Sequence, residues 1–247
     1  MIITRRVNQH PAYILHHRPF RDSSQILEVL TRDYGKIAVV ARGSRSKKSR
    51  FSGILRPFLP LRLSWNSKSN LGTLTGAEAI GLSAGVSGDN IFSAYYVNEL
   101  LINFLHKHDP QPEIFTLYEN IIYKLVGASD VARKLRAFEL ELLKLLGYAV
   151  NLTHENDGIK PIDDKLFYEY KMENGPVAVN HTKGKLIFCG KLLTGISEKR
   201  FDDEETLKAA NKLLRQIIDF HLGGKQLKSR KVLLDLRRCK IAKSKTG

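Results

Sequence analysis

The sequence has few cysteines and no long hydrophobic run. Cys189 and Cys239 are its only two cysteines, which excludes a disulfide framework and a four-thiolate metal site. The longest uninterrupted apolar run is Ile37–Ala41, five residues, whereas a membrane helix needs roughly 20. The first ten residues, MIITRRVNQH, lack the apolar stretch of a secretory signal. These absences predict a protein that contacts no membrane and stays in the cytoplasm.

Acidic residues are scarce relative to basic ones, and the scarcity is uneven. The chain has 40 Lys and Arg against 25 Asp and Glu, a formal charge of +15, with 43% hydrophobic and 26% charged residues. Residues 1–80 carry +10, residues 81–150 carry −2, residues 151–200 carry +1 and residues 201–247 carry +6. The basic residues are concentrated at the two ends of the sequence, and this distribution predicts a dedicated surface for a polyanionic partner.

The first 80 residues read as β structure, because short apolar or alternating segments are separated by turn signals. The expected strands are 12–17, 25–31, 36–41, 59–65 and 71–78. Five closely spaced strands leave no room for crossover helices, so we expect a small antiparallel barrel. The OB-fold is the leading interpretation and an SH3-like barrel is the alternative.

The period changes to helical from Asn90. Apolar spacing predicts helices from residue 90 and over 112–125, and a third that is capped by Ser129 or Asp130 and ends at Gly147. Residues 151–193 return to short alternating segments, and the acids of 202–205 start a last helix that runs to about His221.

The expected fold class is therefore α+β, an OB barrel followed by a helical domain with a small β insertion. The sequence predicts a barrel over 1–80, a helical domain over 81–150 with 194–238, a β insertion over 151–193, and a disordered basic tail over 239–247.

Signatures of catalysis are mostly missing. No glycine-rich phosphate loop, dinucleotide fingerprint or zinc-hydrolase histidine spacing occurs. The clustered acids at 163–164 and 202–205 could hold Mg²⁺ for a nuclease, but their positions at turns and at a helix start favour capping. We expect no enzyme, with a metal-dependent nuclease as an alternative hypothesis.

The strongest positive signal is the segment ARGSRSKKSR after the third expected strand. Its first residue is Ala41, it contains no acid, and its cations are Arg42, Arg45, Lys47, Lys48 and Arg50. A flexible loop of this kind can lie along a phosphate backbone and displace counterions. Aromatic side chains that stack on bases would complete such a site, and the nearby candidates are Tyr34, Phe51, Phe58 and Trp65, each of which could instead belong to the core.

Several segments together resemble the RecO family of bacterial recombination mediators. They include HRPFRDSSQILEVLTRDYGKIAVVARGSRSKKSR, LRPFLPLRLSW, LGTLTGAEAI, YYVNELL, RAFELELLKLLGY and LGGKQLKSR. The resemblance implies an OB-fold, a helical domain and a small β region. It also implies a non-enzymatic role in DNA repair by the RecF pathway. That role is to bind single- and double-stranded DNA, to anneal strands coated with single-stranded DNA-binding protein (SSB), and to help RecR load RecA near the nucleoid.

The resemblance also implies roles for particular residues. The five cations of the basic loop would contact phosphate, and the acidic C-terminal tail of SSB would dock in an apolar pocket of the helical domain, with Arg136 as first candidate cation and Lys134 as second. Many members carry a four-cysteine zinc site in the small β region, but here that region offers only Cys189, His154 and His181. We therefore expect no metal and no cofactor. An RNA-binding OB module stays a further alternative, because an OB-fold can hold either nucleic acid.

Overall fold

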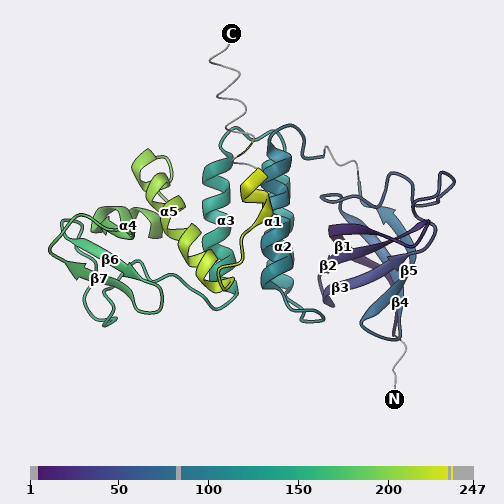
Figure 1. Ribbon diagram of the computed structural model, residues 1–247, viewed down its shortest axis with the longest axis horizontal. Coiled ribbons are helices and arrows are strands. Elements are labelled where there is room, and N and C mark those ends of the chain that lie inside the picture. Colours follow the sequence, from purple (N-terminus) through teal and green to yellow (C-terminus); the bar gives the residue numbers. More distant parts are fainter. Residues whose placement is uncertain (1–4, 82–84, 233–234, 236–247) are drawn as a thin grey trace, which may run out of the picture. The chain divides into compact units, whose positions relative to one another are not determined.

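The computed structural model describes residues 5–81, 85–232 and 235, which form two compact units. The first contains the strands β1 to β5, the helices α1 and α2, and the segment from Leu227; the second lies within Ser129–Gln226 (Figure 1). In the part of the chain that is described, no helix is both long and apolar enough to span a membrane.

A closed five-stranded barrel forms the N-terminal part. Its strands are β1 (Arg5–Phe20), β2 (Ser24–Thr31), β3 (Gly35–Ala41), β4 (Leu61–Ser67) and β5 (Leu71–Ala79). The order around the barrel is β1-β2-β3-β5-β4, and every pair is antiparallel except β3 with β5. This arrangement is OB-like, so the expected fold class is confirmed.

The first strand is longer than the expected segment 12–17. It has 16 residues and pairs with β4 through its first part and with β2 through its last part, with irregularities between Val7 and His10 and between Ile14 and His16. Such bulges bend a strand and increase its twist. One strand can therefore follow the curve of the barrel and close it on both sides.

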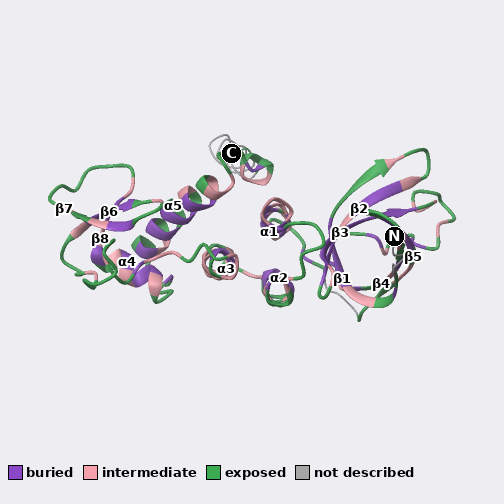
Figure 2. Cartoon of the chain, turned by 90° about the horizontal axis from the view of Figure 1, so that it is seen from below, coloured by how far each residue is buried: buried purple, intermediate pink, exposed green. Residues whose placement is uncertain are grey.

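Strands β2 and β3 are buried on both faces. Every residue of β3 is buried, and so are six of the eight residues of β2. One face fills the barrel core with residues such as Leu27, Val29 and Val39. The other face is also shielded from water, which predicts that a further layer packs outside the barrel (Figure 2).

Helices α1 (Asn90–Phe104) and α2 (Pro112–Leu125) contact the strands of the barrel. The amide of the buried Asn98 on α1 donates to the carbonyl of Leu15 at 2.7 Å, and its oxygen accepts from the Tyr118 hydroxyl at 2.8 Å. The ring of Tyr13 lies 5.1 Å from that of Tyr118 and 5.6 Å from that of Phe115. Burial raises the pKa of Tyr118 well above its ordinary value, so its hydroxyl stays a donor.

The turn before β3 requires a glycine. Gly35 has φ +64°, and a Cβ atom there would lie 2.2 Å from the backbone oxygen of Asp109 in the α1–α2 loop. The neighbouring Lys36 is buried and donates from Nζ to the carbonyl of Ile102 at 2.5 Å. One end of the barrel therefore packs closely against the α1–α2 loop.

The second unit combines three helices with a small sheet. Its helices are α3 (Val131–Leu145), α4 (Gly190–Ser197) and α5 (Glu204–His221), and the sheet order is β7-β6-β8 from β6 (Phe167–Lys171), β7 (Gly175–Val179) and β8 (Ile187–Cys189). Buried residues line one side of α5 (Figure 2). Gly147 has φ +81° after α3, as expected for a left-handed helix terminus.

Helix α4 was not expected from the sequence. It contains Gly190 and Gly195, and glycine is a poor helix former. A Cβ atom on Gly190 would lie 1.9 Å from the carbonyl oxygen of Asp163, and one on Gly195 would lie 2.9 Å from the Thr206 hydroxyl. Close packing therefore requires glycine at these two positions, and their low helix propensity hides the helix from sequence-based prediction. The expected limit of the β insertion, residue 193, falls inside this helix.

The compact units also divide the helices that the sequence assigns to one domain. Helices α1 and α2 belong to the first unit, whereas α3 and α5 belong to the second. The expected tail, 239–247, lies outside the described residues.

Candidate nucleic-acid interface

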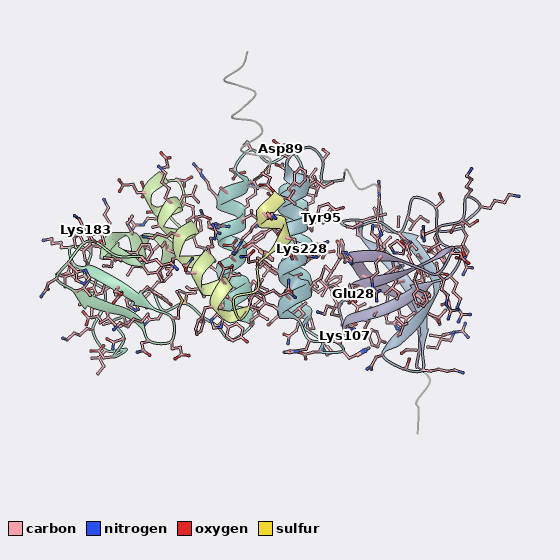
Figure 3. The ribbon with its side chains drawn as sticks, in the orientation of Figure 1. Glu28, Asp89, Tyr95, Lys107, Lys183 and Lys228 are labelled. Carbon is pink, nitrogen blue, oxygen red and sulfur yellow. The ribbon has the colours of Figure 1, made fainter. Side chains whose placement is uncertain are left out.

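The basic loop, residues 42–50, follows β3 and exposes its cations to solvent. All five expected cations are exposed: Arg42, Arg45, Lys47, Lys48 and Arg50. Within the described residues, none of the five forms an ion pair with a carboxylate. Side chains ending in nitrogen project from the loops of the barrel into solvent (Figure 3). The loop therefore presents positive charge that no carboxylate of the described residues neutralises.

Hydrogen bonds to backbone carbonyls fix the start of this loop. Ser44 Oγ donates to the carbonyl of Ala41 at 2.8 Å, and the backbone N–H of Arg45 donates to the carbonyl of Ser23 at 2.8 Å. The guanidinium of Arg45 also reaches the carbonyl of Arg21 at 3.4 Å. The β1–β2 turn and the basic loop are consequently neighbours.

This contact adds a residue that sequence reasoning missed. Arg21 is exposed and lies in the β1–β2 turn, next to Arg45. The turn also contains Asp22, which is exposed and forms no ion pair with the described loop cations. The β1–β2 loop is one of the loops through which OB-folds hold oligonucleotides, and that general rule was the only sequence signal for Arg21.

Arg50 has structural contacts at the far end of the loop. Its guanidinium donates to the carbonyl of Thr75 on β5 at 2.8 Å and lies 4.7 Å from the centre of the Phe51 ring. Phe51 is itself buried in the barrel core. Arg50 therefore ties the loop to the barrel, and a phosphate would have to compete with the Thr75 carbonyl and the Phe51 ring for its guanidinium.

Most of the candidate stacking aromatics belong to the core. Phe51, Phe58 and Trp65 are each less than 7% exposed. The ring of Phe58 packs on Tyr95 of α1, with ring centroids 5.0 Å apart. Only Tyr34 is half-buried. The basic loop therefore has phosphate-binding groups without an adjacent base-stacking surface made from these residues.

The strands β2 and β3, whose face many OB-folds offer to oligonucleotides, are almost fully buried here. Helices α1 and α2 contact β1 of the barrel, where Asn98 bonds Leu15 and the rings of Tyr118 and Phe115 pack on Tyr13. The loops of the closed barrel are the exposed parts that a nucleic acid could reach.

The candidate cations on α3 have a different environment. The side chain of Arg136 is 11% exposed, hydrogen-bonds to Asn211 of α5, and pairs with Glu139 at 2.5 Å. Its Nε is buried and has no hydrogen-bond partner among the described residues. Lys134 pairs with Asp130 one turn earlier in the helix. These cations belong to the second compact unit, whereas the basic loop belongs to the first.

The clustered acids have structural partners. Asp203 caps α5 by accepting from the Thr206 N–H at 2.9 Å and from its hydroxyl at 2.6 Å, and these bonds lower its pKa. Asp163 accepts from the N–H of Lys165, and Asp164 accepts from the Thr194 hydroxyl. The expected capping role is confirmed for Asp203.

The possible zinc ligands of the small β region do not converge. Cys189 Sγ lies 3.0 Å from the carbonyl oxygen of Asp164, and His154 Nδ1 lies 3.0 Å from the hydroxyl of Thr153. Over the residues that the structure describes, no three His, Cys, Asp or Glu side chains are grouped to hold a metal ion. These residues do not fit a structural zinc site, and the absence of metal stays a prediction.

Comparison with known proteins decides the family. Residues 6–82 match the model of the recombination protein O N terminal domain, and residues 87–231 match that of its C terminal domain. The chain belongs to the RecO family. DNA repair protein RecO of Nitrosococcus oceani is 39% identical over 235 residues, which cover 94% of this chain and 95% of that protein. The RecO proteins of Photobacterium profundum and Vibrio parahaemolyticus are 38% and 39% identical, and the matches cover 90% and 92% of this chain and 94% and 93% of those proteins.

Proposed function

We propose that this RecO family member is a non-enzymatic recombination mediator. In this role it binds single- and double-stranded DNA, anneals complementary strands coated with SSB, and acts with RecR to help load RecA, in the cytoplasm at the nucleoid. Family membership supports a role in DNA repair. The domain organisation that we propose for it is the one expected from the sequence, a DNA-binding barrel at 1–80 and a helical domain that contacts the protein partner.

One observation carries the DNA-binding part of this proposal. Five exposed cations lie on one loop, and no carboxylate pairs with them among the described residues. Cations that bind phosphate release counterions and lower the repulsion between two strands. Annealing then needs no covalent chemistry. Because phosphate contacts do not read bases, the same loop serves single- and double-stranded DNA.

The second part of the proposal concerns the SSB tail. Arg136 and Lys134 both lie on α3, where an acidic peptide would have to compete with their present partners. The Asn211 amide is the weakest of these partners, since it carries no charge. We therefore place the carboxylate of the tail at the guanidinium of Arg136, where it would replace Asn211.

The loop is tested by reversing two charges. Lys47→Glu with Lys48→Glu should weaken binding of single-stranded DNA of every sequence, measured by fluorescence anisotropy at low salt. The matched control is Lys183→Glu with Lys185→Glu, because these lysines are also exposed, close in sequence and separated by one residue (Figure 3). Equal affinities of the two double variants would remove the basic loop from the DNA site.

Two further measurements separate the alternatives. An RNA-binding module would prefer RNA when single-stranded DNA and RNA of equal length compete for it. A nuclease would shorten DNA during incubation with Mg²⁺. The mediator predicts intact DNA and no loss of DNA binding to the RNA competitor.

The tail site is tested with a labelled peptide of the SSB C-terminus. Arg136→Lys keeps a charge but loses the planar fork that binds a carboxylate, so it should weaken binding. Lys134→Ala should weaken it less. Lys144→Ala is the control, because Lys144 is an exposed lysine near the end of the same helix. Unchanged binding by Arg136→Lys and Lys134→Ala would place the tail elsewhere.

A further inference from the structure

The barrel has a cavity whose lining residues do not belong to the basic loop. It has a volume of about 160 Å³ and is lined by residues of the β2–β3 turn, the strands β3 to β5 and the α1–α2 loop. At about 30 Å³ per water molecule, this volume corresponds to roughly five waters. Flat aromatic and pyrrolidine rings form part of its wall: Tyr34, Trp65 and Pro110.

The aromatic wall is rigidly held. The ring of Tyr34 stands nearly perpendicular to that of Trp65, at 88° with centroids 5.3 Å apart. Trp65 is 3% exposed, so only part of its edge reaches the cavity, whereas Tyr34 is half-buried. His10 packs against both rings. A ligand would therefore meet preformed rings on part of the wall, with polar groups beside them.

The same cavity has a few polar groups. Asp33, Ser67 and His108 contribute to its lining. The backbone N–H of Asp33 donates to Nε2 of His10 at 3.3 Å, which fixes the start of the turn. Burial is the main cause that lowers the pKa of His10, and this favours the neutral ring that such a bond requires. A carboxylate beside the rings can accept from the amino or ring N–H groups of a nucleobase.

Cations adjoin this cavity without lining it. Arg6 on β1 is paired in register with Asn66, the residue before Ser67, and Lys68 follows Ser67. Lys107 precedes His108 (Figure 3), and its backbone forms an isolated β-bridge with that of Lys36 at the start of β3. Arg6, Lys68 and Lys107 are all exposed. Aromatic rings bordered by cations are the combination with which proteins hold single-stranded nucleic acid.

We propose that this cavity receives one unstacked base of single-stranded DNA. The inference rests on the proposed DNA-binding function and adds a base contact to it. The phosphates on either side of the base lie along Arg6, Lys68 and Lys107, while Tyr34 contacts the face of the base and Asp33 accepts from its edge. A duplex has no unstacked base to offer, so this contact distinguishes single strands from duplex DNA, which the basic loop does not.

The experiment compares two probes that carry the same backbone charge. One is a fluorescein-labelled oligo(dT), and the other is an abasic oligodeoxynucleotide of equal length. The wild-type protein should bind oligo(dT) about five-fold or more tightly than the abasic strand, because stacking of one base on an aromatic side chain contributes a factor of this order. Tyr34→Ala should remove most of that difference and leave the affinity for the abasic strand unchanged.

A filling variant covers the case in which Tyr34→Ala does not fold. Ser67→Leu should also remove the preference for oligo(dT), because the larger side chain occupies the cavity. Among the described residues, the Ser67 hydroxyl bonds the carbonyl of Ser69 in the same loop. Ser69→Leu is the matched control, since Ser69 lies in the same loop but outside the lining, and it should keep the preference.

The possible failures are distinguishable. Equal wild-type affinities for the two probes would overturn the base pocket and leave phosphate binding in place. A preference for oligo(dT) that survives in Ser67→Leu would also overturn it. Wild-type protein that binds neither probe would overturn the proposed DNA-binding function as well.

Discussion

The cations of the basic loop and the cations of α3 have the same chemistry and opposite surroundings. Arg42, Lys47 and Lys48 are exposed and form no ion pair among the described residues, whereas Arg133, Lys134 and Arg136 each pair with a carboxylate. A cation that the protein has already paired stabilises the fold or orients a helix, and a new anionic partner has to displace one of its present partners. A cation that it leaves in water is available to a polyanion. Net charge alone does not separate these roles.

The largest expected effect is on folding, at Arg136. Its partner Glu139 has a side chain that is only 1% exposed. Removing one member of a buried pair costs about 3 kcal/mol or more, because the other charge stays buried. Arg136→Ala should therefore lower the free energy of unfolding by about this amount in a urea titration. Arg42→Ala should change the free energy of unfolding by less than about 0.5 kcal/mol. Equal losses for the two variants would show that pairing does not distinguish the cations of α3 from those of the basic loop.

The next largest effect is the salt dependence of DNA binding. If about five phosphates of a single strand are contacted, the slope of log affinity against log salt should be near −3.5. Affinity should then fall about 100-fold between 50 and 200 mM salt. A slope near zero, from anisotropy titrations over this range, would exclude the basic loop as the main phosphate contact.

A smaller change is expected for one loop cation at a time. Lys48→Ala should make the slope less negative by about 0.7, the contribution of a single phosphate contact on a single strand. Arg50→Ala should change the slope less, because its guanidinium already bonds the carbonyl of Thr75. A larger change for Arg50 than for Lys48 would mean that Arg50 leaves Thr75 when DNA binds.

The smallest effect is expected for the exposed pair of Arg133 and Asp202. Their side chains are 45% and 91% exposed, so solvent screens the attraction between them. Exposed pairs contribute at most about 1 kcal/mol. Arg133→Ala should shift the urea midpoint only slightly. A loss as large as that of Arg136→Ala would show that exposure does not separate the two pairs.

Much of the fold could be predicted from the sequence, because its signals are local. Turn residues and alternation locate four of the five barrel strands to within a few residues, and apolar spacing gives α2 its observed limits. The long β1 and the short α4 could not be predicted in the same way. The length of β1 depends on pairing with two different strands, and the glycines of α4 are required by close contacts with Asp163 and Thr206.

The candidate sites also differ in how far the sequence predicts them. A run of cations without acids is visible in the sequence, and solvent exposure of that run follows from its charge. The partners of Arg136 are not visible, because Asn211 lies on another helix, 75 positions away. Trp65 reads equally well as a stacking residue or a core residue until its burial in the barrel is known.

The sequence by itself determined the barrel, the helices and the place of the free positive charge, since these depend on periodicity, turn chemistry and composition over short windows. Only the tertiary structure decided which cations are paired, that α1 and α2 contact the barrel, and that Tyr34, Trp65 and Pro110 share one cavity. These outcomes depend on contacts between residues far apart in the chain, and no local pattern records them.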